Sequence, residues 1–451
     1  MDEKKQNLFE TDAIPLAVAK LSVPAVLSTI VMVLYNIADT WFVGLLADPV
    51  ESAAVSLAAP ALLLFNAVTN LFGVGGSGMM SRCLGKKDYE TAKRCACFSF
   101  WCALLCAALF SIVYGVGRTW ILKLLGADES TSAATARYLL WTVACGAVPA
   151  ILNVMLSNLI RAEGESMHAG IGVISGCVLN IILDPFFVLP RFLGMGAAGA
   201  GLATFLSNCF AALYMLAVVF FHRRNTCVCL NPLQFCLRKD IVKEVFGVGV
   251  PASIQNLLNV TGSIILNNFT AAYGAAAVSA MGIAHKVNLF PLYLTMGMTQ
   301  GIMPLISYNY SSGNRKRMKD AIMFVLKISV AVTLVLAAIF FICSGGLIRL
   351  FLDDSEVVAH GRILLRAMSV GIPFLALDFS AVAVFQAIGR GSYSLVFAIL
   401  RKIVLEIPAI LLFNYLYPLY GMGFSQSFAE LILAILSIFM LRRIFRETSP
   451  T

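Results

Sequence analysis

Long apolar stretches recur along this whole chain, separated by short segments that hold most of its charge. A bilayer core is about 30 Å thick, so a spanning helix needs about 20 mostly apolar residues. Twelve stretches of that length can be marked, at about 14–44, 52–80, 92–117, 133–160, 166–190, 196–221, 241–272, 278–308, 318–344, 357–388, 393–417 and 421–445. The pattern predicts an all-α polytopic membrane protein with twelve transmembrane helices.

The composition excludes the other broad classes of protein. Of 451 residues, 59% are hydrophobic and only 13% are charged, whereas a soluble domain carries about 25% charged residues. Disordered chains are polar and highly charged, so disorder is excluded as well. The start, MDEKKQNLFETDAIP, is too polar for a cleavable signal peptide. The twelve cysteines lack metal-ligand spacing, which predicts reduced packing residues and no metal centre.

Basic residues collect in alternate loops, which sets the expected orientation. They cluster at 82–94, 223–243, 315–319 and 442–446, and the loops on the opposite side hold mainly acids. The positive-inside rule then places both termini in the cytoplasm. The expected location is the cell (inner) membrane. The net charge of +9 therefore reflects topology, and no nucleic-acid partner is expected.

The second half of the sequence resembles the first. KLSVPA at 20–25 corresponds to GVGVPA at 247–252, and GMGAAGAG at 194–201 corresponds to GMGFSQSF at 421–428, with offsets of about 223–228 residues. Six spans are followed by six more in the same direction, which predicts two pseudo-symmetric six-helix bundles. The expected division is an N-terminal lobe at 1–222, a cytoplasmic linker at 223–240 and a C-terminal lobe at 241–451. Such doubled architectures suit alternating access.

Five acids lie deep within predicted spans: Asp39, Asp184, Asp378, Glu406 and Glu430. A charged side chain at this depth is energetically costly, so each of them is a candidate functional residue.

Two of these acids share a layer with other polar side chains of the first lobe. At 1.5 Å per residue, Asp39 and Asp184 lie roughly 8 Å below the outer edge, and Thr204 lies roughly 12 Å below it. Asn180 precedes Asp184 by one turn on the same face, and Tyr138 belongs to the same layer. Oxygen ligands suit a hard monovalent cation such as Na⁺, and paired carboxylates favour a shared proton. The alternative is a hydrogen-bonded polar plug that only packs the helices.

Pro24 lies in the cytoplasmic half of the first span, fifteen residues before Asp39. A proline inside a helix removes a backbone hydrogen bond. Pro24 is therefore either a hinge that responds to the state of Asp39 or a static kink.

The second lobe does not copy these positions. Its acids Asp378, Glu406 and Glu430 lie nearer the middle of their spans, and Lys286, His285 and Arg366 are the expected partners. The arrangement predicts neutral ion pairs, a cation-attracting wall of the central cavity, or a second coupling site.

Several short motifs follow one another in a fixed order: YNIADTWFVG at 35–44, SRCLGKKDYETAKR at 81–94, LIRAEGES at 159–166, LNIILDPFFV at 179–188 and MPLISYNYSSGN at 303–314. In their twelve-span setting they resemble the multidrug and toxic compound extrusion (MATE) family over essentially the whole chain. The resemblance implies a V-shaped pair of bundles that exports bulky, often cationic organic compounds in exchange for H⁺ or Na⁺.

The resemblance also assigns roles to individual positions. It places the family's cation site on Asp39, Asn180, Asp184 and Thr204, with Tyr138 adjacent, and its bending proline on Pro24. Some sodium-coupled members carry a glutamate in span 7, where this chain reads PASIQNLLNV. That difference argues against a cation site of the family's kind in the C-terminal lobe.

Two other transporters fit the span count: a lipid-linked precursor flippase of the same superfamily and a major-facilitator transporter. No metal, serine–lysine or paired-aspartate motif of an intramembrane enzyme is visible, so an enzyme is not expected. The expected protein is a monomer whose only partners are small organic substrates, the bilayer and the coupling ion, with no cofactor.

Overall fold

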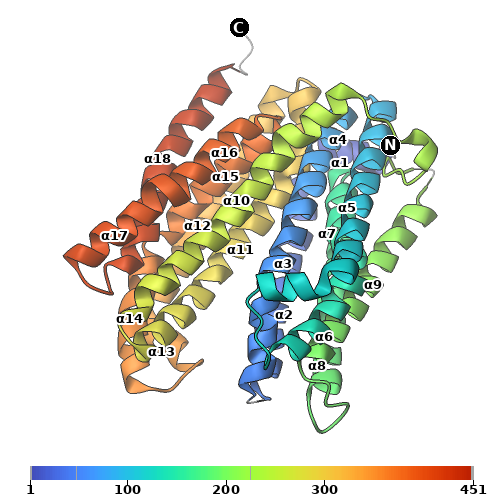
Figure 1. Cartoon of the computed structure of the whole chain (residues 1–451). Coiled ribbons are helices and arrows are strands. Elements are labelled where there is room, and N and C mark those ends of the chain that lie inside the picture. The colour runs from blue at the N-terminus through green and yellow to red at the C-terminus, as the bar shows by residue number, and fades with distance from the viewer. Residues whose placement is uncertain (1–2, 47, 224, 448–451) are drawn as a thin grey trace. The chain divides into compact units, whose positions relative to one another are not determined.

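A computed structural model describes residues 3–46, 48–223 and 225–447, and this part of the chain contains helices, turns and loops but no strand. The helices are coloured along the chain in Figure 1. Each of the twelve predicted spans coincides with one helix or with a short series of consecutive helices. The prediction of an all-α architecture is confirmed.

The first half of the chain begins with a short helix before the first span. In order, the elements are α1 (Glu3–Glu10), α2 (Ile14–Gly44), α3 (Pro49–Thr69), the π-helix η1 (Asn70–Val74), α4 (Gly75–Gly85), α5 (Tyr89–Leu124), α6 (Ser132–Leu139), the π-helix η2 (Leu140–Cys145), α7 (Ala147–Ala162), α8 (Ser166–Val188) and α9 (Ala197–Phe221).

The second half has a similar series of helices, with its interruptions partly in different spans. Its elements are the 3₁₀ turn η3 (Pro232–Gln234), α10 (Lys239–Ala271), α11 (Ala275–Ser311), α12 (Arg315–Ile342), α13 (Ser344–Arg349), α14 (Ser355–Ser369), α15 (Ile372–Ala387), α16 (Gly391–Ile399), the π-helix η4 (Leu400–Glu406), α17 (Ile407–Leu416) and α18 (Met422–Glu447).

Seven helical segments of the described chain are long and apolar enough to cross a membrane on their own. Two bent pairs would bring the number to nine: α6–η2 with α7, bent by 50°, and α14 with α15, bent by 45°. The three remaining predicted spans coincide with α10, with α16–η4–α17 and with α18. The chain is therefore a multi-pass membrane protein.

The two bends occur at corresponding places in the halves. Gly146 and then Pro149 follow η2, and Gly371 and then Pro373 follow α14. A proline lacks the N–H that would continue the helix, and its ring clashes with the preceding turn. At the second bend the hydroxyl of Ser427 donates to the carbonyl of Ala367 at 2.8 Å, which satisfies a backbone acceptor that the bend exposes.

The helices form two compact units. Unit 1 consists of the chain up to residue 12 and of residues 27–253, and unit 2 consists of residues 13–26 and of the chain from residue 254 onward. Unit 2 thus contains the first half of α2, the leading helix of the first repeat. Unit 1 contains the first half of α10, the leading helix of the second repeat. The boundary between the units falls within α2 two residues after Pro24, and within α10 two residues after Pro251. The lobes at 1–222 and 241–451 follow the sequence repeat and stay a prediction.

The first half of α10 packs tightly within unit 1. A methyl group added at Gly249 would lie 2.0 Å from the Leu71 carbonyl oxygen, and one added at Gly75 would lie 2.3 Å from that of Val245. Only glycine permits this backbone approach. Arg82 of α4 also pairs with Glu244 of α10, with Nη2 and Oε2 2.9 Å apart.

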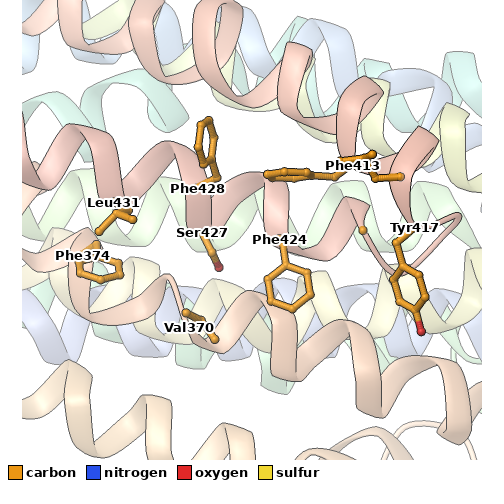
Figure 2. A pocket seen from close by; sticks show the side chains of 10 residues that line it. Val370, Phe374, Phe413, Tyr417, Phe424, Ser427, Phe428 and Leu431 are labelled. Carbon is orange, nitrogen blue, oxygen red and sulfur yellow. The ribbon is translucent and has the colours of Figure 1, made fainter.

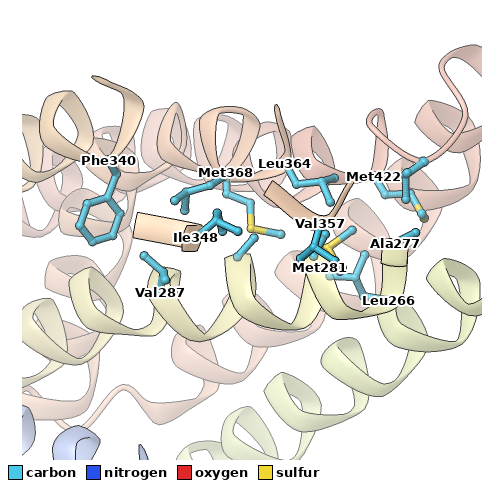
Figure 3. Close-up of a cluster of buried hydrophobic side chains, with 14 of the residues drawn as sticks. Leu266, Ala277, Met281, Val287, Phe340, Ile348, Val357, Leu364, Met368 and Met422 are labelled. Atoms are coloured by element: carbon cyan, nitrogen blue, oxygen red, sulfur yellow. The ribbon is translucent and has the colours of Figure 1, made fainter. Parts of the chain in front are cut away.

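An apolar cluster forms part of the core of unit 2 (Figure 3). Met281 of α11 and Leu364 of α14 are fully buried in it, and Phe340 of α12 and Ile348 of α13 complete its wall. The cluster fixes the bent pair α14–α15 against α11.

Candidate ion sites and an apolar pocket

Four helices of unit 1 contribute polar side chains to one site. Helix α8 carries Asn180 and Asp184 one turn apart, so both point to the same side. Helix α9 contributes Thr204, α6 contributes Tyr138, and the second half of α2 contributes Asp39.

The Asn180 amide connects two of these helices. When its nitrogen faces Asp184, Nδ2 donates to Asp184 Oδ2 at 3.0 Å, and the amide oxygen accepts from the backbone N–H of Thr204 at 3.2 Å. The orientation satisfies both ends of the amide at once, so Asn180 holds the Asp184 carboxylate in place against α9.

Two tyrosines stand beside the carboxylates. Tyr35 of α2 forms a side-chain hydrogen bond with Thr204 and interacts electrostatically with Asp39 and Asp184. Tyr138 lies close enough to interact with both aspartates and with Tyr35. Tyr35 was not among the predicted site residues, although it precedes Asp39 by one turn and therefore shares its helix face.

Each aspartate retains an oxygen without a partner. Asp184 is fully buried, Asn180 is 2% exposed and Tyr138 is 3% exposed, whereas Asp39 is partly exposed. Among the described residues, Asp39 Oδ1 and Asp184 Oδ1 are buried and accept no hydrogen bond. Buried carboxylate oxygens are normally satisfied, so these two atoms are suited to take up a proton or a hard monovalent cation.

The structure thus brings together Asp39, Asn180, Asp184, Thr204 and Tyr138, the residues that depth alone assigned to one layer. We call them, with Tyr35, the unit 1 site. Their role in binding an ion stays a prediction.

A second group of ionisable residues lies inside unit 2, and we call it the Arg401 cluster. It consists of Asp378 on α15, Arg401, Lys402 and Glu406 on η4, and Glu430 on α18. Arg401 forms an ion pair with Asp378, and its Nε lies 3.2 Å from Glu430 Oε1. Lys402 Nζ lies 2.7 Å from Glu406 Oε2.

Two of the three expected partners of these acids were wrong. Lys286 is exposed, and Arg366 donates instead to the Phe341 carbonyl and the Ser344 hydroxyl. The third, His285, interacts with Glu406 and also bonds through Nε2 to Ser263 Oγ at 3.2 Å. The true partners come from η4, where i→i+5 bonding adds a residue to the turn and changes which side chains point inward.

Pro24 lies inside the continuous helix α2. Two residues before it, the Ser22 hydroxyl donates to the Met298 carbonyl of α11 at 3.2 Å, and a methyl group at Gly301 would lie 2.5 Å from the Ser22 Cα. This half of α2 is therefore closely packed within unit 2. The hinge role of Pro24 stays a prediction.

An apolar pocket of about 480 Å³ opens in unit 2 between the α14–α15 bend and helices α17 and α18 (Figure 2). Its walls are mainly aromatic and aliphatic, with Phe374, Phe413, Phe424 and Phe428 among them. The Ser427 hydroxyl is already bonded to the Ala367 carbonyl. The pocket therefore suits an apolar group.

Comparison with known proteins agrees with this organisation. The MatE family model matches the chain twice, at residues 24–186 and 251–412. The two matches begin in the leading helix of each half, at Pro24 and Pro251. They confirm the internal repeat that the sequence motifs predicted.

Individual relatives align over the whole chain. The multidrug export protein MepA of Staphylococcus aureus (strain MRSA252) is 31% identical over 454 residues, which cover 100% of this chain and 99% of MepA. A multidrug resistance MATE family transporter of the MOP superfamily, solved in an outward-facing conformation, has a TM-score of 0.92 at 25% identity, with 99% of each chain covered.

A second similar structure is a MOP superfamily transporter from Pyrococcus furiosus, with a TM-score of 0.91 at 25% identity over 100% of each chain. It is described as having a binding pocket of reverse polarity that suggests a different function. The family match, the relatives and the helical architecture agree, and this chain belongs to the MATE family of membrane transporters.

Proposed function

We propose that this protein exports bulky organic compounds, many of them cationic, in exchange for H⁺ or Na⁺ that moves inward. The observation that supports ion coupling is the unit 1 site, where Asp39 and Asp184 each have a buried oxygen that accepts no hydrogen bond from the described residues. The names of its relatives, multidrug export protein and multidrug resistance transporter, support the substrate class.

The unit 1 site can change charge at low structural cost. A proton or Na⁺ neutralises one carboxylate, and Asn180, which donates to Asp184 Oδ2 and accepts from the Thr204 N–H, keeps the Asp184 side chain in position. Loss of the ion leaves two negative charges in a buried site, which is unfavourable and biases the helices toward another arrangement. The state of the ion is thereby linked to the conformation of α2, α8 and α9.

The twofold repeat supports alternating access as the transport mechanism. Pro24 would supply a bending point in α2, two residues before this helix passes from unit 2 into unit 1. The loop charges support a location in the cell membrane with both termini in the cytoplasm. A monomer is sufficient for this mechanism, with no cofactor beyond the coupling ion.

The test is efflux of ethidium from cells and from proteoliposomes by Asp39→Asn and Asp184→Asn variants. Coupling free energies of about 1–3 kcal/mol correspond to about 5–150-fold, so we expect at least about tenfold slower export with unchanged membrane insertion. Glu129→Gln, in an exposed loop, is the matched control and should export normally. Normal export by either aspartate variant would overturn the proposed coupling site.

The coupling ion is identified by imposing a pH gradient or a sodium gradient separately on the same proteoliposomes. The coupling ion is the one whose gradient drives ethidium efflux by the native protein but not by Asp184→Asn.

A lipid-linked precursor flippase of the same superfamily predicts a different result. Such a protein needs unpaired basic residues to receive a pyrophosphate, whereas Arg401 and Lys402 are both paired with acids. Translocation of a lipid pyrophosphate without ethidium efflux would favour the flippase over the exporter.

A further inference from the structure

The Arg401 cluster holds an unusual amount of charge in the interior of unit 2. The exposed fractions of its side chains are 5% for Arg401, 1% for Asp378, 2% for Glu430, 7% for Glu406 and 13% for Lys402. Buried charges of this kind persist only when they are paired. The balance between acids and bases in the cluster therefore determines its chemistry.

The cluster has one more acid than it has bases. Asp378, Glu406 and Glu430 supply three carboxyl groups against the guanidinium of Arg401 and the ammonium of Lys402. Glu430 interacts electrostatically with Arg401, Lys402 and Glu406, so the two ion pairs form one group of charges. If every member were ionised, one negative charge would remain uncompensated inside a membrane helix bundle, which is costly.

The neighbouring elements add one more ionisable group. His285 of α11 interacts with both Lys402 and Glu406 and bonds to Ser263 of α10. Helix α10 otherwise presents Gly262, where an added methyl group would lie 2.9 Å from Lys402 Cδ. The excess charge can therefore be compensated by a proton on one of the carboxyl groups or on His285.

Geometry leaves a place for a proton and none for a metal ion. The Arg401 guanidinium contacts both Asp378 and Glu430, which is the position that a metal cation bound by these carboxylates would take. The Phe379 ring covers it, with its centroid 4.5 Å from Cζ. On the other side, Glu430 Oε2 is buried without a hydrogen-bond partner among the described residues.

We propose that the Arg401 cluster is a second ion site of this protein, one that binds a single exchangeable proton and excludes a metal cation. The proton adds to a carboxylate to give a neutral carboxylic acid, or to the imidazole to give an imidazolium, and its loss restores the former state. The proposal deepens the proposed function, since it rests on ion coupling and assigns H⁺ to unit 2.

The test counts dissociable protons in the purified protein, without transport. The background is the double variant Asp39→Asn/Asp184→Asn, which removes the carboxylates of the unit 1 site. Proton release on a pH step, and the infrared band of protonated carboxyl groups, are compared between this background and added substitutions within the cluster. We expect one proton in the background beyond those of the loops.

The number of protons should follow the charge balance. Glu430→Gln, Glu406→Gln and Asp378→Asn each remove the excess acid, so each should abolish this proton. Arg401→Gln removes a base and should add a second proton, whereas Arg401→Lys keeps the charge and should leave the count at one. Asp353→Asn, on an exposed loop, controls for the loss of an unrelated acid.

Sodium binding supplies the second readout. Radioactive ²²Na⁺ should not bind the double-variant background, because Arg401 occupies the space between the carboxylates. If the background binds Na⁺ and Asp378→Asn abolishes that binding, the exclusion of metal cations is wrong. If the number of released protons stays the same in all three acid variants, the proton site is wrong. Because the background does not need to transport, either result is independent of ethidium efflux. Export that survives Asp184→Asn would instead count against the unit 1 site.

Discussion

Lys5 shows how a single charged residue contributes to the fold outside the membrane spans. It is 7% exposed, and its Nζ lies 3.2 Å from Glu163 Oε1 and 3.3 Å from Glu165 Oε1. Glu163 also accepts from the Thr226 hydroxyl at 2.8 Å and from the Cys227 N–H at 2.9 Å. One carboxylate therefore ties α1 and the segment after α9 to the loop between α7 and α8.

This arrangement predicts a pH dependence of stability. Burial alone would lower the pKa of Lys5, but Glu163 and Glu165 more than offset that effect and raise it above 10.5. A raised lysine pKa in the folded state contributes stability that is complete below the unfolded pKa and is lost as pH rises through the folded value. We expect Lys5→Met to lower unfolding free energy by about 1–3 kcal/mol at neutral pH and to flatten the decline above pH about 10.5.

Thermal unfolding of the detergent-purified protein, followed across pH, measures both effects. Lys4→Met is the control, because Lys4 is exposed. If the native protein and Lys5→Met lose stability in parallel above pH about 10.5, the ion pair does not contribute as described.

At the scale of elements, two glycines of α10 differ sharply in their surroundings. A methyl group at Gly249 would lie 2.0 Å from the Leu71 carbonyl oxygen, whereas one at Gly247 would meet nothing within 4 Å. Both residues are in the same helix. Intrinsic helix propensity favours alanine at either position by about 0.5–1 kcal/mol, so any opposite effect must come from packing.

We therefore expect Gly249→Ala to destabilise the protein by about 1–3 kcal/mol and Gly247→Ala to be neutral or slightly stabilising. Chemical or thermal unfolding of the two variants in the same detergent gives the comparison. Equal stability of both variants would show that α10 and η1 can separate without cost.

The extent of each element was largely predictable from the sequence, and its internal geometry was not. The expected spans at 14–44 and 166–190 compare with α2 at Ile14–Gly44 and α8 at Ser166–Val188, because loop charges and apolar runs mark span ends directly. No comparable sequence signal indicates where a π-helix begins or ends. Depth placed Asp184 and Thr204 in one layer, and in the structure the Asn180 amide connects them. The inward position of Arg401 on η4 depends on the extra residue in the turn of a π-helix, which the sequence pattern does not reveal.

At the scale of the whole molecule, each unit includes half a helix from the other repeat. Residues 14–26 of α2 belong to unit 2, and residues 239–253 of α10 belong to unit 1. Pro24 and Pro251 stand two residues before these two boundaries between the units. The chain therefore passes between the units within these two helices, and also between Asp12 and Ala13.

Pro24→Ala should therefore slow export severalfold while leaving ion binding at the unit 1 site unchanged. A proline in a helix interior costs about 3 kcal/mol, so the variant should also be more stable. Pro60→Ala, inside α3 and wholly within unit 1, is the matched control. Ethidium efflux and ion affinity are measured together, and an equal loss of export in both variants would contradict a special role for Pro24.

The exchange of half-helices has a consequence for any chain that contains only one of the two repeats. A protein with only one six-span repeat could not complete either unit, because the first half of its leading helix would lack its packing surface. Two copies would complete each other by swapping these halves, as domain-swapped homodimers do. A half-length chain with a single repeat is thus expected to need a second, swapped copy to complete its units.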